Sequence, residues 1–271
     1  MSWHDGIRRQ LSEGLGSRAD NEINQLNNAL RLLAKHRSVL IQNTLIQNEG
    51  LNVLQGPLAG LEFISQSAEG CHIAKLLGCY EQPLQSYVEA AIEADYDTII
   101  NIGCAEGYYA VGMARKLKTT KTYAYDTNEK AQLACKELAE KNGTSDRVEV
   151  GAYFSHADFE EFAGQNALIF CDIEGAEVEL LDPNLANELK FMDLIVEAHE
   201  GDRPGTVDLL IKRFTETHSI EVVEDDGQRN LGKMPQWFMN LSHLDQLLAT
   251  WEWRSGPTPW LVMKSKSHQI K

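Results

Sequence analysis

From about residue 96 onward, short apolar runs alternate with stretches of helix-forming residues. Their lengths and flanking turn residues are typical of strands that alternate with helices. The strand candidates lie at residues 97–102, 121–125, 147–150, 167–171, 192–196, 219–223 and 260–263, and the main helical stretches at 108–117, 129–141 and 205–217. Such an alternation builds right-handed βαβ units around a mostly parallel sheet with both faces covered. The sequence therefore predicts an α/β, doubly wound domain with a mostly parallel, seven-stranded sheet.

The first 80 residues have a different composition, which is rich in Asn and Gln, and some of their apolar residues follow heptad spacing. These residues are Ile23, Leu26, Leu30, Leu33 and Leu40, and Arg37 interrupts one of the heptad positions. A short stripe of this kind most often packs on its own domain, and otherwise forms an arm that pairs two subunits. The glycines and proline within residues 50–65 indicate a turn or hairpin.

We therefore expect two parts. Residues 1–80 would form an N-terminal helical and hairpin extension, which serves in homodimerisation or covers the substrate. Residues 81–271 would form the sheet-containing domain, with a lid-like insertion at about 224–259. That insertion carries aromatic residues and two arginines, so it could cover a substrate or form a small satellite core.

The composition of the chain indicates which binding partners and which cellular compartment to expect. The chain of 271 residues has a net charge of −15, which disfavours binding to nucleic acid because that affinity comes from clustered cations. The five cysteines include no C-x-x-C pair, which fits reduced thiols better than disulfides or a zinc site. No run is apolar enough for a membrane span, and Met1–Gln10 lacks the core of a secretory signal. We expect a cytoplasmic protein without a membrane partner.

The first strand leads into a glycine turn that could approach a ligand closely. The turn runs from Gly103 through Ala105 and Glu106 to Gly107, and a helix follows it. A dinucleotide fingerprint would need glycines at positions 105 and 108, where the chain has Ala105 and Tyr108. A nicotinamide-dependent oxidoreductase is therefore disfavoured. The carboxylate of Glu106 better suits a ligand that carries an amino group.

An acidic residue follows the second strand at the position expected for a ribose-binding carboxylate. Asp126 lies 126 − 103 = 23 residues after Gly103, near the roughly 20 of nucleotide-binding α/β folds. A carboxylate can accept hydrogen bonds from both vicinal hydroxyls of a ribose. The alternative is that Asp126 or Thr127 only caps the next helix.

Together these residues resemble a class I S-adenosylmethionine-dependent methyltransferase. Residues 102–108 are similar to the first motif of that family and Tyr125-Asp126 to its second. Residues 170–177 resemble the D-x-E-G-x-E signature of the FkbM-like branch. The resemblance covers about residues 78–265. It implies S-adenosylmethionine as the cofactor and methyl transfer to an oxygen atom of a small-molecule acceptor; a non-catalytic scaffold that binds the cofactor is the alternative.

The resemblance also assigns residues to parts of the cofactor. The glycine turn would line the methionine part, with Glu106 near its amino group. Asp126 would hold the ribose hydroxyls, Thr127 and the loop around Tyr153 would lie at the adenine, and Tyr80 with Glu81 would close over the carboxylate end. The implied cofactor-binding set is Tyr80, Glu81, Gly103, Ala105, Glu106, Gly107, Asp126, Thr127, Tyr153 and Asp172.

Candidates for the chemistry follow the fourth and fifth strands. The catalytic candidates are His199, Asp172 and Glu174. His199 is the best single base because an imidazole accepts a proton near neutral pH. Alternatively, Asp172 could bind a divalent metal ion together with Glu197, His199 or Glu200, or proximity alone could drive the transfer. For Glu177 we expect a structural role, in which its charge complements the amino end of a helix.

Overall fold

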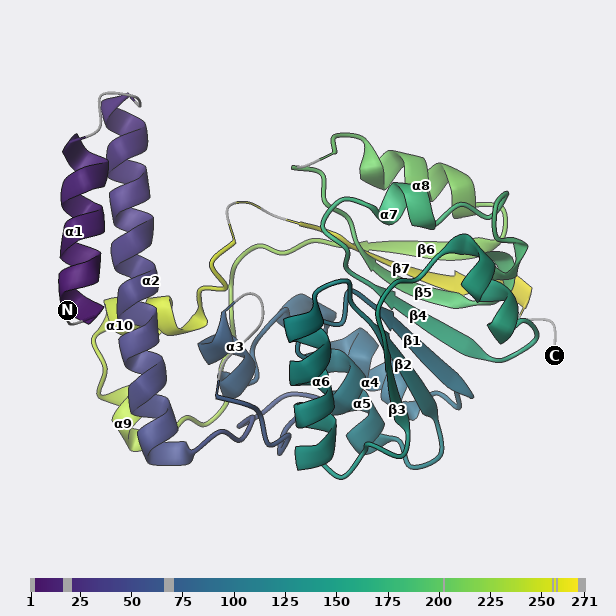
Figure 1. Ribbon diagram of the computed structural model, residues 1–271, viewed down its shortest axis with the longest axis horizontal. Helices are drawn as coiled ribbons and strands as arrows, with labels where there is room; N and C mark the ends of the chain where they lie inside the picture. The colour runs from purple at the N-terminus through teal and green to yellow at the C-terminus, as the bar shows by residue number, and fades with distance from the viewer. Residues whose placement is uncertain are drawn as a thin grey trace.

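The predicted α/β fold is confirmed by a seven-stranded sheet with a doubly wound topology. The computed structural model describes residues 3–16, 21–65, 71–201, 203–254, 256 and 258–267. The strand order is β3-β2-β1-β4-β5-β7-β6, and the order reverses after β3, where the chain crosses to the other side of β1 to form β4 (Figure 1). The strands are β1 (Thr98–Ile102), β2 (Lys121–Tyr125), β3 (Val148–Gly151), β4 (Ala167–Cys171), β5 (Asp193–Glu197), β6 (His218–Val223) and β7 (Trp260–Ser265).

Six of the seven strands run in the same direction, and β7 runs antiparallel between β5 and β6. The register aligns the last residues of β1, β2 and β4, since Ile102 pairs with both Tyr125 and Cys171. The loops that leave these strands therefore begin at the same edge of the sheet. In folds of this kind ligands bind at that edge, near the point where the strand order reverses.

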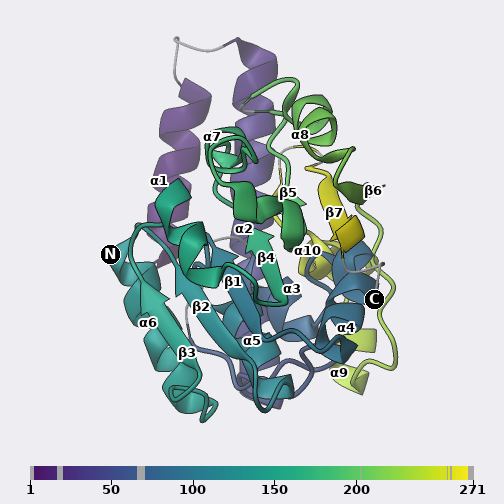
Figure 2. The same cartoon turned by 90° about the vertical axis from the view of Figure 1, so that its right-hand side faces the viewer.

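Helices cover both faces of the sheet (Figures 1 and 2). One face packs on α4 (Gln85–Glu93), α5 (Tyr108–Lys116) and α6 (Glu129–Lys141), and the other on α7 (Glu177–Leu180) and α8 (Thr206–Phe214). Side chains of β1 alternate between the two cores: Ile99 lies in the first, Ile100 and Ile102 in the second. A strand buried on both faces explains why the sequence shows a continuous apolar run there.

The N-terminal part consists of α1 (Trp3–Gly16), α2 (Glu22–Glu49) and α3 (His72–Leu77). The first two helices form a hairpin at one end of the molecule, away from the sheet (Figure 1). The segment after α2 turns through Gly56 and Gly60 and forms a single bridge between Asn52 and Glu62 in place of a full β-hairpin. Within the described ranges, no helix is long and apolar enough to cross a membrane.

The first four residues of the heptad stripe do not pack on their own domain, so the commoner of the two expectations is wrong for them, whereas Leu40 is half-buried. Ile23, Leu26, Leu30 and Leu33 are 70%, 64%, 67% and 48% exposed. The reason is geometric, because α2 reaches the body of the molecule only in its second half, where Ile41 and Leu45 are buried. The first half is left with α1 as its main neighbour.

The insertion between β6 and β7 carries α9 (Gln236–Met239) and α10 (His243–Thr250), which lie beside α2 (Figure 1). Phe238 and Ala249 are buried in the same core as the second half of α2. An ion pair between Arg37 and Asp245, 2.7 Å apart, joins α2 to α10. The helical part of the insertion therefore belongs to the hydrophobic core. The segments before α9 and after α10 lie nearer the carboxyl edge of the sheet.

Candidate active site

The glycine turn after β1 is held against the loop after β4. Gly103 has a φ of 79°, and a Cβ atom there would lie 1.6 Å from the backbone oxygen of Asp172. Only glycine fits a position with that backbone conformation and so close a neighbour. The turn therefore fixes Asp172 at the carboxyl end of the sheet, as well as offering its own backbone to a ligand.

A pocket of about 360 Å³ lies between this turn and the loops that follow β2, β3 and β4. A volume of this size is in the range of small-molecule sites. The predicted cofactor-binding residues that line it are Gly103, Asp126, Thr127, Tyr153 and Asp172. Glu174 lines it as well, together with Phe154 and His156. The other predicted residues, namely Tyr80, Glu81, Ala105, Glu106 and Gly107, lie outside its lining.

Asp126 is fixed by two backbone amides rather than by capping the following helix. Its Oδ2 accepts a hydrogen bond from the N–H of Ala105 (2.9 Å), and its Oδ1 accepts one from Asn128 (2.8 Å). The cap of α6 is Asn128, whose side chain accepts from the N–H of Lys130. Each carboxylate oxygen retains a lone pair, so Asp126 can still accept from a ligand in the pocket.

Glu106 does not line the pocket and pairs instead with Lys75, for which no role was predicted from the sequence. Its side chain is fully buried, and its Oε1 lies 2.5 Å from Nζ of Lys75 on α3. The ring of Tyr80 stacks beside the same ammonium group, at 4.9 Å. In this arrangement the charge of Glu106 is matched within the protein. A lysine in the otherwise apolar run His72–Leu77 was the available signal for such a partner.

His199 lies among four carboxylates at the ends of β4 and β5. Its Nδ1 is 2.8 Å from Oε1 of Glu177, and its Nε2 faces Glu174 at 3.3 Å, Asp172 at 3.6 Å and Glu197 at 3.9 Å. The structure thus brings together all three residues that the sequence marks as catalytic candidates. Because Asp172 also lines the pocket, this cluster and the pocket share a wall.

The carboxylates control the charge of His199. Burial alone would lower its pKa, but hydrogen bonds to Glu174 and Glu177, together with the charges of Asp172 and Glu197, raise the pKa of His199 to about 11. Burial raises the pKa of Asp172 well above its usual value, and repulsion from Glu197 and Glu81 raises it further. The cluster therefore holds a proton or another cation strongly.

Glu200 and Glu177, which follow the same two strands, also accept hydrogen bonds from backbone N–H groups. Glu200 accepts hydrogen bonds from the N–H groups of Gly205 and Val207, so it caps the amino end of α8. Glu177 is fully buried, and its Oε1 accepts from the N–H groups of Ile173 and Gly175 in addition to His199. These three hydrogen bonds hold both the loop after β4 and the side chain of His199 in place. Glu177 therefore does more than the expected role of complementing the charge at the amino end of a helix.

The residues of the cluster also fit a divalent metal ion. Asp172, Glu174 and His199 each offer one ligand atom, and these atoms lie within 4.8 Å of one another. Oδ1 of Asp172 is buried and has no hydrogen-bond partner in the described part of the chain. A histidine whose second ring nitrogen is held by a carboxylate is typical of metal ligands. Oxygen and imidazole donors suit magnesium, manganese or zinc.

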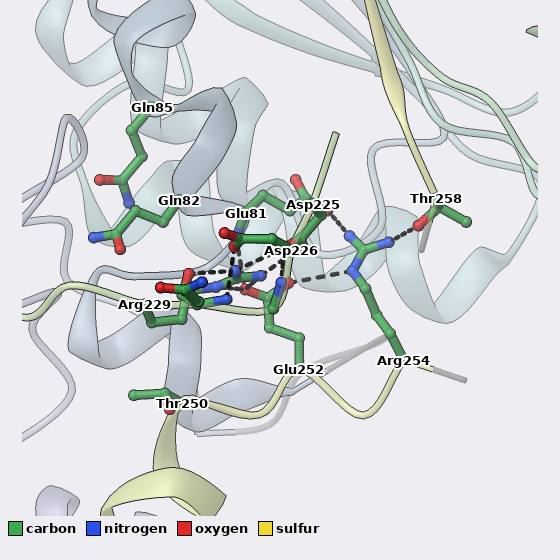
Figure 3. Close-up of polar contacts among 12 residues, drawn as sticks. Glu81, Gln82, Gln85, Asp225, Asp226, Arg229, Thr250, Glu252, Arg254 and Thr258 are labelled. Carbon is green, nitrogen blue, oxygen red and sulfur yellow. Dashed lines mark hydrogen bonds and ion pairs between the residues drawn. The ribbon is translucent and has the colours of Figure 1, made fainter. Parts of the chain in front are cut away.

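A network of buried charges connects this site to the ends of the insertion (Figure 3). Arg254 lies 2.5 Å from Glu81 and 3.2 Å from Glu252, and it also pairs with Glu197 at the end of β5. Tyr109 donates a hydrogen bond to the other oxygen of Glu81 (2.5 Å). Arg254 therefore joins the insertion, the segment before α4 and the end of β5 at one point.

The second arginine of the insertion is matched in the same way (Figure 3). Arg229 is 2.5 Å from Glu252 and 2.6 Å from Asp225. Both guanidinium groups are therefore committed to carboxylates of the protein. Neither arginine therefore offers a free positive charge to a substrate beneath the insertion.

Comparisons with known proteins indicate little beyond the fold. No family model matches the sequence, and no curated protein matches it. Among solved structures, an O-methyltransferase from Bacillus cereus in complex with SAH is 16% identical, over 68% of this chain and 81% of that chain, with a TM-score of 0.44. The O-methyltransferase TomG from Streptomyces achromogenes, in complex with SAM, is 15% identical over 56% and 76%, with a TM-score of 0.42. A precorrin-6y C5,15-methyltransferase from Geobacter metallireducens is 9% identical over 66% and 88%, with a TM-score of 0.44. Likenesses this distant do not establish an activity, which has to be inferred from the site.

Proposed function

We propose that the chain is an S-adenosylmethionine-dependent methyltransferase of the FkbM-like branch that acts on a small-molecule acceptor at oxygen. The observation that carries the proposal is the position of Asp172. It lines the pocket that also contains Gly103 and Asp126, and it lies 3.6 Å from Nε2 of His199. A nucleoside held by Asp126 would thus place its other end beside a group that can take up a proton.

The residues around the pocket fit S-adenosylmethionine. Asp126 would accept from the ribose hydroxyls, and Thr127 with Tyr153 would border the adenine. The cofactor, when bound, supplies an activated methyl group on a sulfonium. The carboxylate of Asp172 would attract that positive charge, and Phe154, which is 5% exposed, gives the pocket an apolar wall. Glu81 and Tyr80 would act only indirectly, through Arg254 and Lys75.

His199 would take the proton of the acceptor at Nε2. Its Nδ1 is engaged by Glu177, so Nε2 is the ring nitrogen that faces the site. The cationic cofactor beside Asp172 would oppose a second positive charge on His199 and so lower the pKa of its imidazole. If Asp172, Glu174 and His199 instead hold a metal ion, the ion would orient the acceptor oxygen and lower its pKa.

Binding of S-adenosylhomocysteine tests the proposed cofactor. We expect micromolar affinity by isothermal titration calorimetry, and at least tenfold weaker binding in Asp126→Ala, because hydrogen bonds to a charged carboxylate contribute about 1.5–3 kcal/mol each. Asp126→Asn retains an acceptor atom and should lie between the two. Thermal unfolding of each variant separates loss of affinity from loss of fold. Folded wild-type protein that gives no heat with S-adenosylhomocysteine would overturn the proposal, and a thermal shift with NADH would point to an oxidoreductase.

We also propose that the exposed stripe of α2 pairs two copies of the chain. Ile23, Leu26, Leu30 and Leu33 follow heptad spacing over the half of α2 that leaves the body of the molecule. The next heptad position is Arg37, which is bound to Asp245 of its own chain, so the free stripe ends where α2 meets its domain. A heptad stripe is complementary to a second copy of itself.

Sedimentation or light scattering tests this arm. We expect the wild type to be a dimer, and Leu26→Glu combined with Leu30→Glu to be a monomer at the same concentration. Leu133→Glu serves as the control, because Leu133 on α6 is equally exposed, at 66%, but isolated from the stripe. A wild type that is monomeric at high concentration, or a double variant that remains dimeric, would exclude the arm as the dimer contact.

A further inference from the structure

The carboxylate of Glu177 is the least expected feature of the site. The side chain is fully buried, at the first residue of α7, and Oε1 accepts three hydrogen bonds. Two come from the N–H groups of Ile173 (3.1 Å) and Gly175 (3.2 Å), and the third joins Nδ1 of His199 (2.8 Å). These donors belong to the loop after β4 and the loop after β5, so one oxygen connects the two loops that carry the candidate catalytic groups.

The loop between β4 and α7 has an unfavourable backbone conformation, which the hydrogen bonds to Glu177 help to stabilise. Glu174 has a φ of 54°, a left-handed conformation that a residue with a side chain adopts only at a cost. Gly175 follows with a φ of 103°. The N–H groups on both sides of Glu174 point to the oxygen of Glu177, and this holds the turn that aims Glu174 at Nε2 of His199, 3.3 Å away.

The same oxygen sets which nitrogen of His199 can act. A carboxylate accepts and does not donate, so Nδ1 of His199 must carry a proton in order to bind Glu177. The ring is then oriented with Nε2 toward Asp172 and Glu174. Whether Nε2 takes a proton or binds a metal ion, it does so because Nδ1 is occupied.

We infer that Glu177 is a positioning residue, which holds the Ile173–Gly175 turn and the imidazole of His199 in the arrangement that methyl transfer needs. The inference rests on the proposed function for its catalytic part. The structural part, in which one carboxylate oxygen fixes two loops, stands without it. Glu177 lies outside the pocket lining and touches neither the proposed cofactor nor the acceptor.

The experiment compares Glu177→Ala and Glu177→Gln with a buried carboxylate that lies elsewhere. Asp193→Asn is the matched control. Asp193 is 6% exposed and bound to Tyr96, Lys264 and Ser265, but it lies at the opposite end of β5 from His199. Gln keeps an oxygen that can accept the same three donors, whereas Ala removes it. Hydrogen exchange of the Ile173 and Gly175 amides is measured without cofactor, beside S-adenosylhomocysteine affinity, kcat and KM.

In Glu177→Ala we expect exchange at Ile173 and Gly175 to be at least tenfold faster and kcat about tenfold lower, with S-adenosylhomocysteine affinity and cofactor KM within about threefold of the wild type. Glu177→Gln should keep most of the protection and recover part of kcat. Asp193→Asn should lower the unfolding temperature without changing kcat. If Glu177→Ala does not fold, protected amides and a modest loss of kcat in Glu177→Gln still support the inference.

Three results would overturn it. The first is unchanged exchange at Ile173 and Gly175 in Glu177→Ala, and the second is fast exchange in Glu177→Gln with wild-type kcat. The third is an equal fall of kcat in Glu177→Ala and Asp193→Asn, which would mark a general loss of stability. Failure of the proposed function gives a different pattern, because the wild type itself would then not bind S-adenosylhomocysteine while the exchange result remains readable.

Discussion

Replacement of His199 by alanine is expected to lower turnover by about 10²–10⁴-fold, the range that a positioned proton acceptor contributes. Its Nε2 faces Asp172 and Glu174 at the wall of the pocket, and His199 itself is only 6% exposed. S-adenosylhomocysteine affinity should stay within a few-fold of the wild type, because His199 does not line the pocket. Release of S-adenosylhomocysteine, measured over a panel of hydroxyl- and carboxyl-bearing small molecules, supplies the rate, and the fastest acceptor is then used for the variants.

The control is His218→Ala. His218 is as buried as His199, at 2%, and bonds to Met192 and Thr217 beyond the other end of β5. It should lose stability and keep its turnover per folded molecule. Dialysis against a chelator distinguishes the two roles of His199: activity that survives supports the proton acceptor, and activity that is lost and restored by magnesium supports a ligand. Unchanged turnover in His199→Ala would exclude both roles.

The fold followed from the sequence because its signals are local. The central strands β1, β4 and β5 are short, fully buried runs that are mostly apolar. The two faces of β1 enter different cores, so the run needs no alternation to be recognised. Gly103 and Asp126 could be placed for the same reason, since the turn and the acid follow strands whose ends align in a parallel sheet. Position along a strand thus translates directly into position in the site.

Contacts between residues that are far apart in the sequence could not be predicted in this way. Glu106 is at the expected place in the turn, yet its carboxylate forms an ion pair with Lys75 on α3. Nothing in the spacing of residues 75 and 106 indicates that they meet, because α3 belongs to the N-terminal part. Glu177 resembled a residue at the amino end of a helix, and its bond to His199 emerges only when β4 and β5 pair.

Replacement of Arg254 by methionine is expected to destabilise the fold by about 3–5 kcal/mol near pH 8, the usual cost of leaving buried charges without their partner. Arg254 pairs with Glu81, Glu197 and Glu252, which are each no more than 6% exposed. Figure 3 shows Arg254 beside Glu81 and Glu252. Methionine fills much of the space without the charge. Chemical denaturation monitored by circular dichroism gives the free energy of unfolding.

The loss should depend on pH with a definite sign. Burial first, and then repulsion from Glu197, raise the pKa of Glu81 to about 8 even though Arg254 opposes both. A carboxyl with a higher pKa in the folded state binds its proton more tightly when folded. The free energy of unfolding therefore falls as pH rises from the unfolded value of 4.5 toward about 8. Arg254 also opposes the raised pKa of Glu252, so without it Glu252 as well as Glu81 binds its proton more tightly in the folded state. The variant should therefore lose stability more steeply between pH 5 and pH 8 and approach the wild type near pH 5.

The control for Arg254→Met is Arg147→Met. The side chain of Arg147 is buried to the same degree, 20% against 22% exposed, but it donates mainly to the carbonyls of Ala114 and Leu117. Its loss should cost stability equally at pH 5 and pH 8, because no buried carboxylate loses a partner. Arg254→Lys keeps the charge and should recover part of the difference at pH 8. A loss in Arg254→Met that is the same at both pH values would mean that packing by the arginine, and not its charge, holds the insertion on the sheet.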